Sequence, residues 1–125
     1  MKTKREAIQV LRILRRTREL IQRGWMRGSF FDNSSTDIHN AADFQTCCLE
    51  GAIWWSTAES YGSCKLGMLT PVSGLVKSQI HQTLKEEYNP AEWNDAVATN
   101  VSDVIDLIDK TVARVRAVAV SLPLK

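Results

Sequence analysis

The side chains best suited to nucleophilic catalysis or metal binding are three cysteines and two histidines: Cys47, Cys48, Cys64, His39 and His81. A zinc site usually takes two cysteines separated by two to four residues, so that both thiolates reach one ion. Cys47 and Cys48 are adjacent, and adjacent side chains point about 100° apart on a helix. No nucleophile elbow surrounds Cys48 or Cys64. We therefore expect no metal, no cofactor and no catalytic residue, and a small cysteine-dependent enzyme using Cys48 stays open as an alternative.

Phosphate binding by arginines is the second chemistry that the sequence offers. Residues 1–23 carry eight basic and two acidic side chains, a net charge of +6, whereas the remaining residues carry a net charge of −4. Arg5, Arg12 and Arg16 fall on one face of the helix expected there, opposite its apolar stripe. Such arginines can neutralise nucleic-acid phosphates, but charged rows are more often solvated helix faces, and no known nucleic-acid-binding module is present. Nucleic-acid binding through these three arginines is therefore an alternative function.

Apolar residues recur at helical spacing over residues 3–23 and predict the first helix. The residues of this stripe are Ala7, Val10, Leu11, Leu14 and Ile21, with Ile8, Ile13 and Leu20 beside it. Gly24 is expected to end the helix.

Residues 24–42 are rich in turn-forming residues, yet they contain Trp25 and two phenylalanines. Aromatic side chains in a loop usually anchor it to a core, so we expect a packed irregular segment. Trp54 and Trp55 lie in the next helix and point to different sides of it. Trp54 is therefore a candidate interface residue, and the alternative is that it packs beneath residues 24–42.

A second helix is expected over residues 43–60, where apolar residues occur nearly all round the helix. One face is formed by Phe44, Cys47, Cys48, Ala52 and Trp55. A helix of this kind belongs at the centre of a fold. Gly51 in its middle costs about 1 kcal/mol relative to alanine, and we expect a neighbouring helix to approach closely there in compensation.

Two proline-containing signals predict the next helix starts. Thr70-Pro71 supplies an N-cap and a first helical residue, and this third helix is expected to run to about Tyr88. Asn89-Pro90 repeats the signal, with Glu92 at the capping-box position. It predicts a single helical turn that bears Trp93.

The last helix is expected to start near Asn100 or Ser102 and to end by Pro123. Its predicted apolar stripe consists of Val101, Ile105, Ile108, Val112, Val115 and Ala119. Aspartates gather in its first half and basic residues in its second, which complements the helix dipole.

These elements predict an all-α fold: one domain over residues 1–125, built as a compact bundle of about four helices with a packed irregular segment after the first. No apolar run approaches the roughly 20 residues of a membrane span, and no secretory signal is recognised. An odd number of cysteines, two of them adjacent, is typical of a reducing compartment. We therefore expect a cytoplasmic protein.

Several short patterns resemble those of an uncharacterised family of small helical proteins, widespread in bacteria, phages and plasmids. They are Trp25-x-x-Gly28, Cys48-x-x-Gly51-Ala52, Trp93-Asn94-Asp95 and, in the last helix, Leu107-x-Asp109. Their order and spacing are similar to the family's, and the resemblance covers most of residues 18–112. It implies a helical fold, and because the family's function is unknown it implies no activity.

A ligand or partner site, if these patterns form one, would lie at Trp25, Cys48, Trp93, Asn94 and Asp95. The alternative is structural, with Asn94 and Asp95 satisfying backbone groups before the last helix. The favoured function is a non-enzymatic protein-interaction module with an unidentified protein partner. One concrete form is an accessory protein of a phage or mobile element that binds a host macromolecule.

Overall fold

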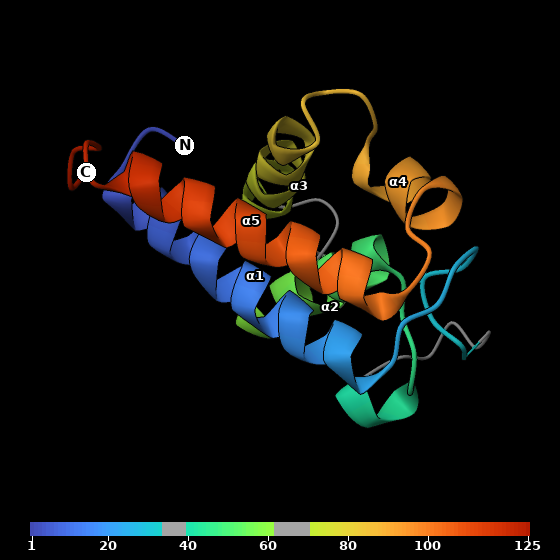
Figure 1. Ribbon diagram of the computed structural model, residues 1–125. Coiled ribbons are helices and arrows are strands. Elements are labelled where there is room, and N and C mark those ends of the chain that lie inside the picture. The colour runs from blue at the N-terminus through green and yellow to red at the C-terminus, as the bar shows by residue number, and fades with distance from the viewer. Residues whose placement is uncertain (34–39, 62–70) are drawn as a thin grey trace.

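The computed structural model describes residues 1–33, 40–61 and 71–125. Within these ranges the chain forms five α-helices, one short 3₁₀ helix and no β-strand. They are α1 (Lys4–Arg23), η1 (Ala41–Asp43), α2 (Leu49–Tyr61), α3 (Pro71–Thr83), α4 (Pro90–Ala96) and α5 (Val101–Ala119) (Figure 1). The all-α class is thus confirmed. Four longer helices form the bundle, and the seven-residue α4 stands where a single turn was predicted.

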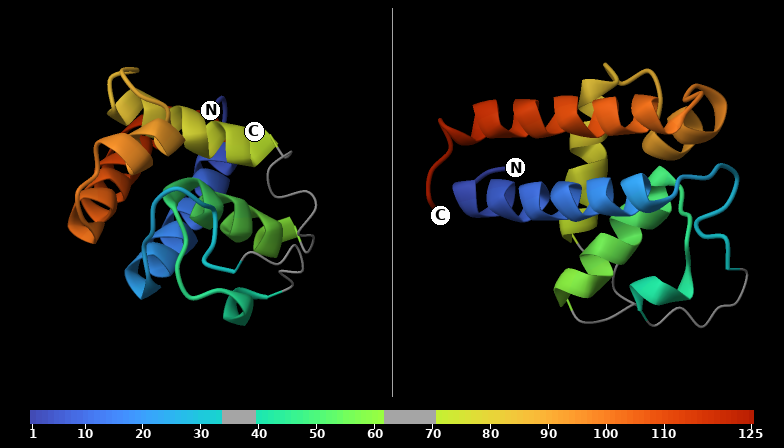
Figure 2. Two further views of the ribbon diagram at one scale, coloured as in Figure 1. Left: turned by 90° about the vertical axis from the view of Figure 1, so that its right-hand side faces the viewer. Right: turned by 60° about the horizontal axis from the view of Figure 1, so that its bottom comes forward.

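The helices α1 and α5 lie side by side and antiparallel, and they form one layer of the bundle (Figures 1 and 2). Two contacts fix their register. The backbone N–H of Lys4 donates to the carbonyl of Pro123 at 2.7 Å, and Arg18 forms an ion pair with Asp109 at 2.7 Å. In both pairs the residue numbers add to 127, which indicates that residues of α1 and α5 whose numbers add to about 127 lie at similar levels.

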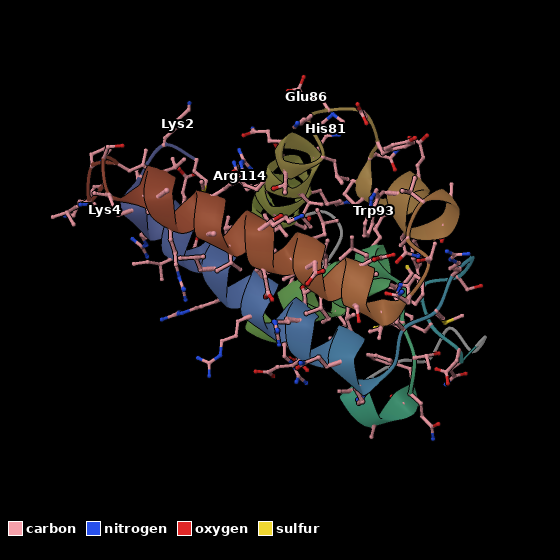
Figure 3. All side chains as sticks on the ribbon, viewed as in Figure 1. Lys2, Lys4, His81, Glu86, Trp93 and Arg114 are labelled. Carbon is pink, nitrogen blue, oxygen red and sulfur yellow. The ribbon has the colours of Figure 1, made fainter. Side chains whose placement is uncertain are left out.

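The helices α2 and α3 pack against one face of the α1–α5 layer (Figure 2). Arg114 of α5 reaches α3, where its guanidinium donates to the carbonyl of Gln79 at 3.0 Å (Figure 3). The fully buried aliphatic side chains lie between these layers. They include Leu14, Leu20, Ile21, Leu49, Ile53, Ile80 and Ile108. Each such side chain stabilises the fold by about 1.5–3 kcal/mol through burial.

The first helix matches its prediction. Thr3 caps its start, because its side chain accepts the backbone N–H of Glu6 at 3.1 Å. The N–H of Gly24 donates to the carbonyl of Leu20 and closes the last turn. Four of the five predicted stripe residues are buried, as are Ile13 and Leu20 beside them, whereas Leu11 is only half-buried. Ile8 differs, because it is 52% exposed.

The second helix begins later than predicted, because α2 starts at Leu49 rather than near residue 43. Residues 44–48 are not helical, and their backbone forms hydrogen bonds with the segment after α1. The N–H of Cys47 donates to the carbonyl of Gly24 (3.0 Å), and the carbonyl of Cys47 accepts the N–H of Met26 (3.1 Å). These tertiary hydrogen bonds satisfy backbone groups that a helix would otherwise satisfy. The spacing of apolar residues gives no sign of them.

The segment after α1 is packed, as predicted, by aromatic contacts. The ring of Phe31, 8% exposed, lies 4.5 Å from that of Phe44 and 5.4 Å from that of Trp54. Phe44 also meets the buried Trp55 edge to face at 5.8 Å. Trp54 is therefore half-buried beneath this segment, and Trp55 points into the core.

The third helix starts at Pro71 as predicted, while its predicted cap Thr70 lies outside the described residues. It ends at Thr83, earlier than the predicted Tyr88. The reason lies in two consecutive residues, Lys85 and Glu86, whose φ angles of 55° and 62° are left-handed and cannot continue the helix.

The predicted cap at Asn89 is confirmed, and Asn100 is the cap of the last helix. The capping box is not formed, because the Glu92 carboxylate accepts from the side-chain amide of Asn89 and not from its backbone N–H. The side chain of Asn89 accepts the N–H of Glu92 at 2.8 Å to start α4, and that of Asn100 accepts the N–H of Asp103 at 3.0 Å to start α5. The helix α5 ends at Ala119, ahead of Pro123.

The apolar face predicted for α5 is rotated relative to the observed one. The buried residues of α5 are Val104, Leu107, Ile108, Thr111 and Val115. The predicted Val101 is 40% exposed, and Ile105 and Val112 are half-buried. The rotation arises because α5 packs on α3 as well as on α1, so residues between those two contacts are the most buried. None of the described helices, α5 included, has the length and apolar composition of a membrane span.

Candidate functional site

The side-chain amide of Asn94 in α4 joins the segment after α1 to the start of α2. It is fully buried (0% exposed), and its Oδ1 accepts the indole N–H of Trp25 (2.7 Å) and the backbone N–H of Leu49 (3.0 Å). Its Nδ2 donates to the carbonyl of Met26 (3.3 Å) and to Oδ1 of Asp95 (2.8 Å). Because an amide can accept two hydrogen bonds and donate two, the polar atoms of Asn94 are fully used in holding the fold.

The location of these bonds corrects one sequence expectation. Asn94 and Asp95 do satisfy backbone groups, but not those that precede the last helix. Asn94 caps α2, because the N–H of Leu49 is one of the four at a helix start that lack a partner within the helix. Asp95 accepts the N–H of Gly28 at 3.0 Å. Gly28 has a φ of 80°, which glycine adopts without steric cost, so α4 fixes the turn from Trp25 to Gly28.

Cys48 is the N-cap of α2 rather than a residue of its first turn. Its carbonyl accepts the N–H of Ala52 (2.9 Å), and its Sγ accepts the N–H of Gly51 (3.2 Å). Burial raises the pKa of the Cys48 thiol, and hydrogen bonds from the N–H groups of Gly51 and Glu50 oppose that rise only in part. A thiol with a raised pKa is a weak nucleophile at neutral pH.

Gly51 is explained by a close approach, though not by the helix that was expected. A Cβ at this position would lie 2.4 Å from the carbonyl oxygen of Phe30. The same oxygen accepts the N–H of Cys48 at 3.1 Å. The neighbour of Gly51 is therefore the backbone of the segment after α1, held against the first turn of α2.

A pocket of about 360 Å³ opens beside this junction, and its wall includes Phe30, Cys48, Glu50 and Asp95. The carboxylate of Glu50 is paired with Lys77 at 3.3 Å. The polar side chains of the pocket are thus two carboxylates, the hydroxyl of Ser29 and the buried thiol of Cys48. It suits a small polar group, and it contains no activated nucleophile.

The other cysteine and histidine candidates do not complete a catalytic group in the described residues. Burial raises the pKa of the Cys47 thiol to about 12. His81 lies in the last turn of α3, and its Nδ1 is 2.6 Å from the carbonyl oxygen of Tyr88. His39 and Cys64 lie outside the described residues. Across residues 1–33, 40–61 and 71–125, no three His, Cys, Asp or Glu side chains gather closely enough to hold a metal ion.

The three segments that meet at Asn94 all lie within a match to a known family. DUF6197, a family of unknown function, matches residues 5–114. The chain belongs to DUF6197. No curated protein and no solved structure matches it. The resemblance drawn from Trp25, Cys48 and Asn94 is thereby confirmed at the level of the family.

The junction gathers four of the six residues predicted as a ligand or partner site in this DUF6197 protein. Trp25, Cys48, Asn94 and Asp95 meet there. Trp93 instead contributes its ring to the core and is 9% exposed (Figure 3). Trp54 lies on another part of α2, against the ring of Phe30 at 5.8 Å and that of Phe31.

The three arginines proposed for phosphate binding have different surroundings. Arg5 and Arg12 are exposed. Arg16 is paired with Glu59 of α2 through two hydrogen bonds (2.9 and 3.0 Å) and with Glu19 through a third (3.1 Å). The hydrogen bond to Glu59, together with that to Glu19, raises the pKa of the Arg16 guanidinium, so its positive charge is kept and is ion-paired. Arg16 therefore ties α1 to α2 and is poorly placed to meet a phosphate.

Two further arginines of the basic helix are also engaged. The guanidinium of Arg18 makes two hydrogen bonds to Asp109, at 2.7 and 3.1 Å. Arg23 donates to the carbonyls of Ala41 and Phe44, both at 2.7 Å, and lies 4.5 Å from the centre of the Phe44 ring. Much of the excess charge of residues 1–23 thus serves to hold the fold.

An outer groove of about 520 Å³ runs between α1 and α5, on the face opposite α2 and α3. It is lined by Ile8, Leu11, Arg12, Arg15, Arg18, Asp109, Val112 and Arg116. Its lining combines an apolar floor with four arginines and a single carboxylate. Arg12 and Arg116 form no ion pair with any carboxylate of the described residues.

Of the residues that line this groove, only Arg12 was a predicted site residue. Arg116 seemed only to complement the helix dipole, and Val112 was assigned to the core. The missing information was the register of α1 against α5, which places Leu11 level with Arg116 and Arg15 level with Val112. No local pattern encodes that register; the sequence signals only that the first and last helices are both amphipathic.

Proposed function

We propose that the protein is a non-enzymatic protein-interaction module whose binding surface is the α1–α5 groove. The observation that carries the proposal is the combination, in one groove, of an apolar floor with two arginines that have no carboxylate partner. Side chains of the floor remain accessible, since Ile8 is 52% exposed. Apolar surface beside arginine is typical of protein interfaces.

Nucleic-acid binding through Arg5, Arg12 and Arg16 is the less favoured alternative. A phosphate backbone needs accessible positive charge along its path, and Arg16 is already bonded to two carboxylates. An apolar floor also contributes nothing to phosphate contacts. Both observations favour a protein partner.

The non-enzymatic part of the proposal draws on the thiols. The pKa values of Cys47 and Cys48 are raised by burial, whereas a catalytic cysteine needs a lowered one. The same free, buried thiols are consistent with a cytoplasmic location. An accessory protein of a phage or mobile element, which binds and blocks a host macromolecule, is the concrete form of this proposal; it draws on the small size of the chain and on the family resemblance.

The test is a pull-down from host lysate with and without nuclease, using the wild type and two variants. The first is Arg12→Glu combined with Arg116→Glu in the groove, and the second is Arg5→Glu, which reverses an exposed charge on the same helix outside it. We expect a stoichiometric protein that survives nuclease, is lost with the groove variant and is kept by Arg5→Glu. Material that disappears with nuclease, or that Arg5→Glu releases equally, would shift the function to nucleic acid.

A further inference from the structure

We infer that the groove binds an acidic amphipathic helix of the partner protein, laid along the α1–α5 pair. This inference rests on the proposed function and adds the chemistry of the partner. It is carried by three features of the groove: its length, its floor and the charges on its two sides.

The length of the groove fits about three helical turns. It extends on α1 from Ile8 to Arg18, ten residues along the helix, which corresponds to about 15 Å. The ion pair between Arg18 and Asp109 closes one end. Beyond the last lining residue of α5, Arg116, the C-cap residue Val120 is 78% exposed.

The floor has the character of a helix-binding groove. Ile8 and Leu11 of α1 face Val112 of α5 across it, and the last two are half-buried where they meet the core. A helix that docks in such a groove buries apolar residues spaced three and four apart. An extended peptide would bury alternate residues on a sheet edge, and in the described residues no strand offers such an edge.

The charges lie on both sides of the apolar floor. Arg12 and Arg15 belong to α1, and Arg116 faces them from α5 at the level of Leu11. Glu19 of α1, which does not line the groove, is shared by Arg15 (3.8 Å) and Arg16 (3.1 Å). Since Arg15 is 85% exposed, its contact with Glu19 holds it weakly. A helix with acidic residues on both sides of its apolar stripe would therefore meet arginines on both sides.

The experiment uses the full chain and a synthetic probe. The probe is a fluorescently tagged peptide of about 14 residues with leucines at helical spacing flanked by glutamates. A second peptide has the same composition in an order that destroys the amphipathic spacing, and a single-stranded oligonucleotide supplies phosphates. Binding is measured by fluorescence anisotropy for the wild type, for Arg12→Glu with Arg116→Glu, for Arg5→Glu and for Asp109→Asn.

We expect the amphipathic peptide to bind the wild type. The groove variant should lower the peptide affinity by about tenfold, because it replaces two exposed attractive charge contacts by repulsive ones. Arg5→Glu should change the affinity less than about twofold, and Asp109→Asn should strengthen binding, because it frees Arg18. Circular dichroism and melting temperature establish that each variant is folded, so a loss of binding is not a loss of structure.

Equal binding of the rearranged peptide would overturn the inference, because charge alone would then suffice. So would an oligonucleotide that binds where the peptide does not, or a groove variant that leaves peptide affinity unchanged. The proposed function has a separate outcome: if a lysate protein depends on Arg12 and Arg116 but the peptide does not displace it, the interaction module stands and only the acidic helix is wrong.

Discussion

The indole N–H of Trp25 donates to Oδ1 of Asn94 at 2.7 Å, across 69 residues of sequence. The same oxygen accepts the first backbone N–H of α2, that of Leu49. One buried amide therefore sets the position of the segment after α1, the start of α2 and α4. This arrangement gives Trp25 and Asn94 a structural role, whatever else they do.

Replacing Asn94 tests that role directly. We expect Asn94→Ala to lower the free energy of unfolding by about 3 kcal/mol, because two N–H donors lose their acceptor, one of them buried at a helix start. Urea unfolding followed by tryptophan fluorescence gives the value. The control is Asp95→Asn, which keeps the Oδ1 that accepts Gly28 and should change stability by less than about 0.5 kcal/mol. Equal losses in the two variants would contradict the central position of Asn94.

Replacing the helical glycines Gly51 and Gly74 by alanine should change the free energy of unfolding in opposite directions. Alanine usually stabilises a helix by about 1 kcal/mol relative to glycine. At Gly74 in α3 a Cβ would meet nothing within 4 Å, so Gly74→Ala should raise the free energy of unfolding by up to that amount. At Gly51 the Cβ would meet the Phe30 backbone, so Gly51→Ala should lower it by about 2 kcal/mol. Thermal or urea unfolding distinguishes the signs, and a stabilised Gly51→Ala would show that the segment after α1 can move aside.

Glycine should stabilise the connection between α3 and α4. Lys85 and Glu86 both have left-handed φ angles, which cost a residue with a Cβ about 1 kcal/mol each. Glu86→Gly is therefore expected to raise the free energy of unfolding by about 0.5–1 kcal/mol. The neighbouring Glu87 has no positive φ, so Glu87→Gly should give no gain and serves as the control. A gain in both would point to charge rather than to backbone conformation.

The raised pKa of Cys47 predicts a loss of stability in alkali. Below pH 9.0, the ordinary pKa of a thiol, Cys47 is protonated in both states and no stability is lost. Above it the unfolded thiol ionises first, so the free energy of unfolding falls until the folded pKa of about 12 is reached. The limiting slope is about 1.4 kcal/mol per pH unit. Cys47→Ala removes this contribution, so its pH profile should be flatter than that of the wild type, and identical profiles would contradict the burial of the thiol.

The elements that the sequence predicted well are those determined by neighbouring residues. The apolar stripe of α1 and the caps at Asn89 and Asn100 depend on contacts three or four residues apart, so spacing alone identifies them. The start of α2 depends instead on Gly24 and Met26, whose backbones bond to Cys47. Local patterns carry no information about such partners.

In the candidate surfaces, too, the residue types could be named from the sequence, whereas their tertiary contacts could not. The motif residues Trp25, Cys48 and Asn94 were named from the sequence, but only the fold reveals that they meet and that their polar atoms are occupied. The groove required the register of α1 against α5, and two of its residues had been given other roles. An ion pair such as that of Arg16 with Glu59 likewise depends on the packing of two helices and has no sequence signal of its own.

The hydrogen bond from the N–H of Leu49 to Asn94 makes the opening of α2 depend on the opening of α4. The first turn of α2 is complete only when α4 has docked, so neither can open alone without exposing a buried polar group. The amide hydrogen of Leu49 should therefore exchange with solvent through the global unfolding reaction rather than by local fraying. In a helical protein, where helix ends are usually the first amides to exchange, this helix start would be among the last.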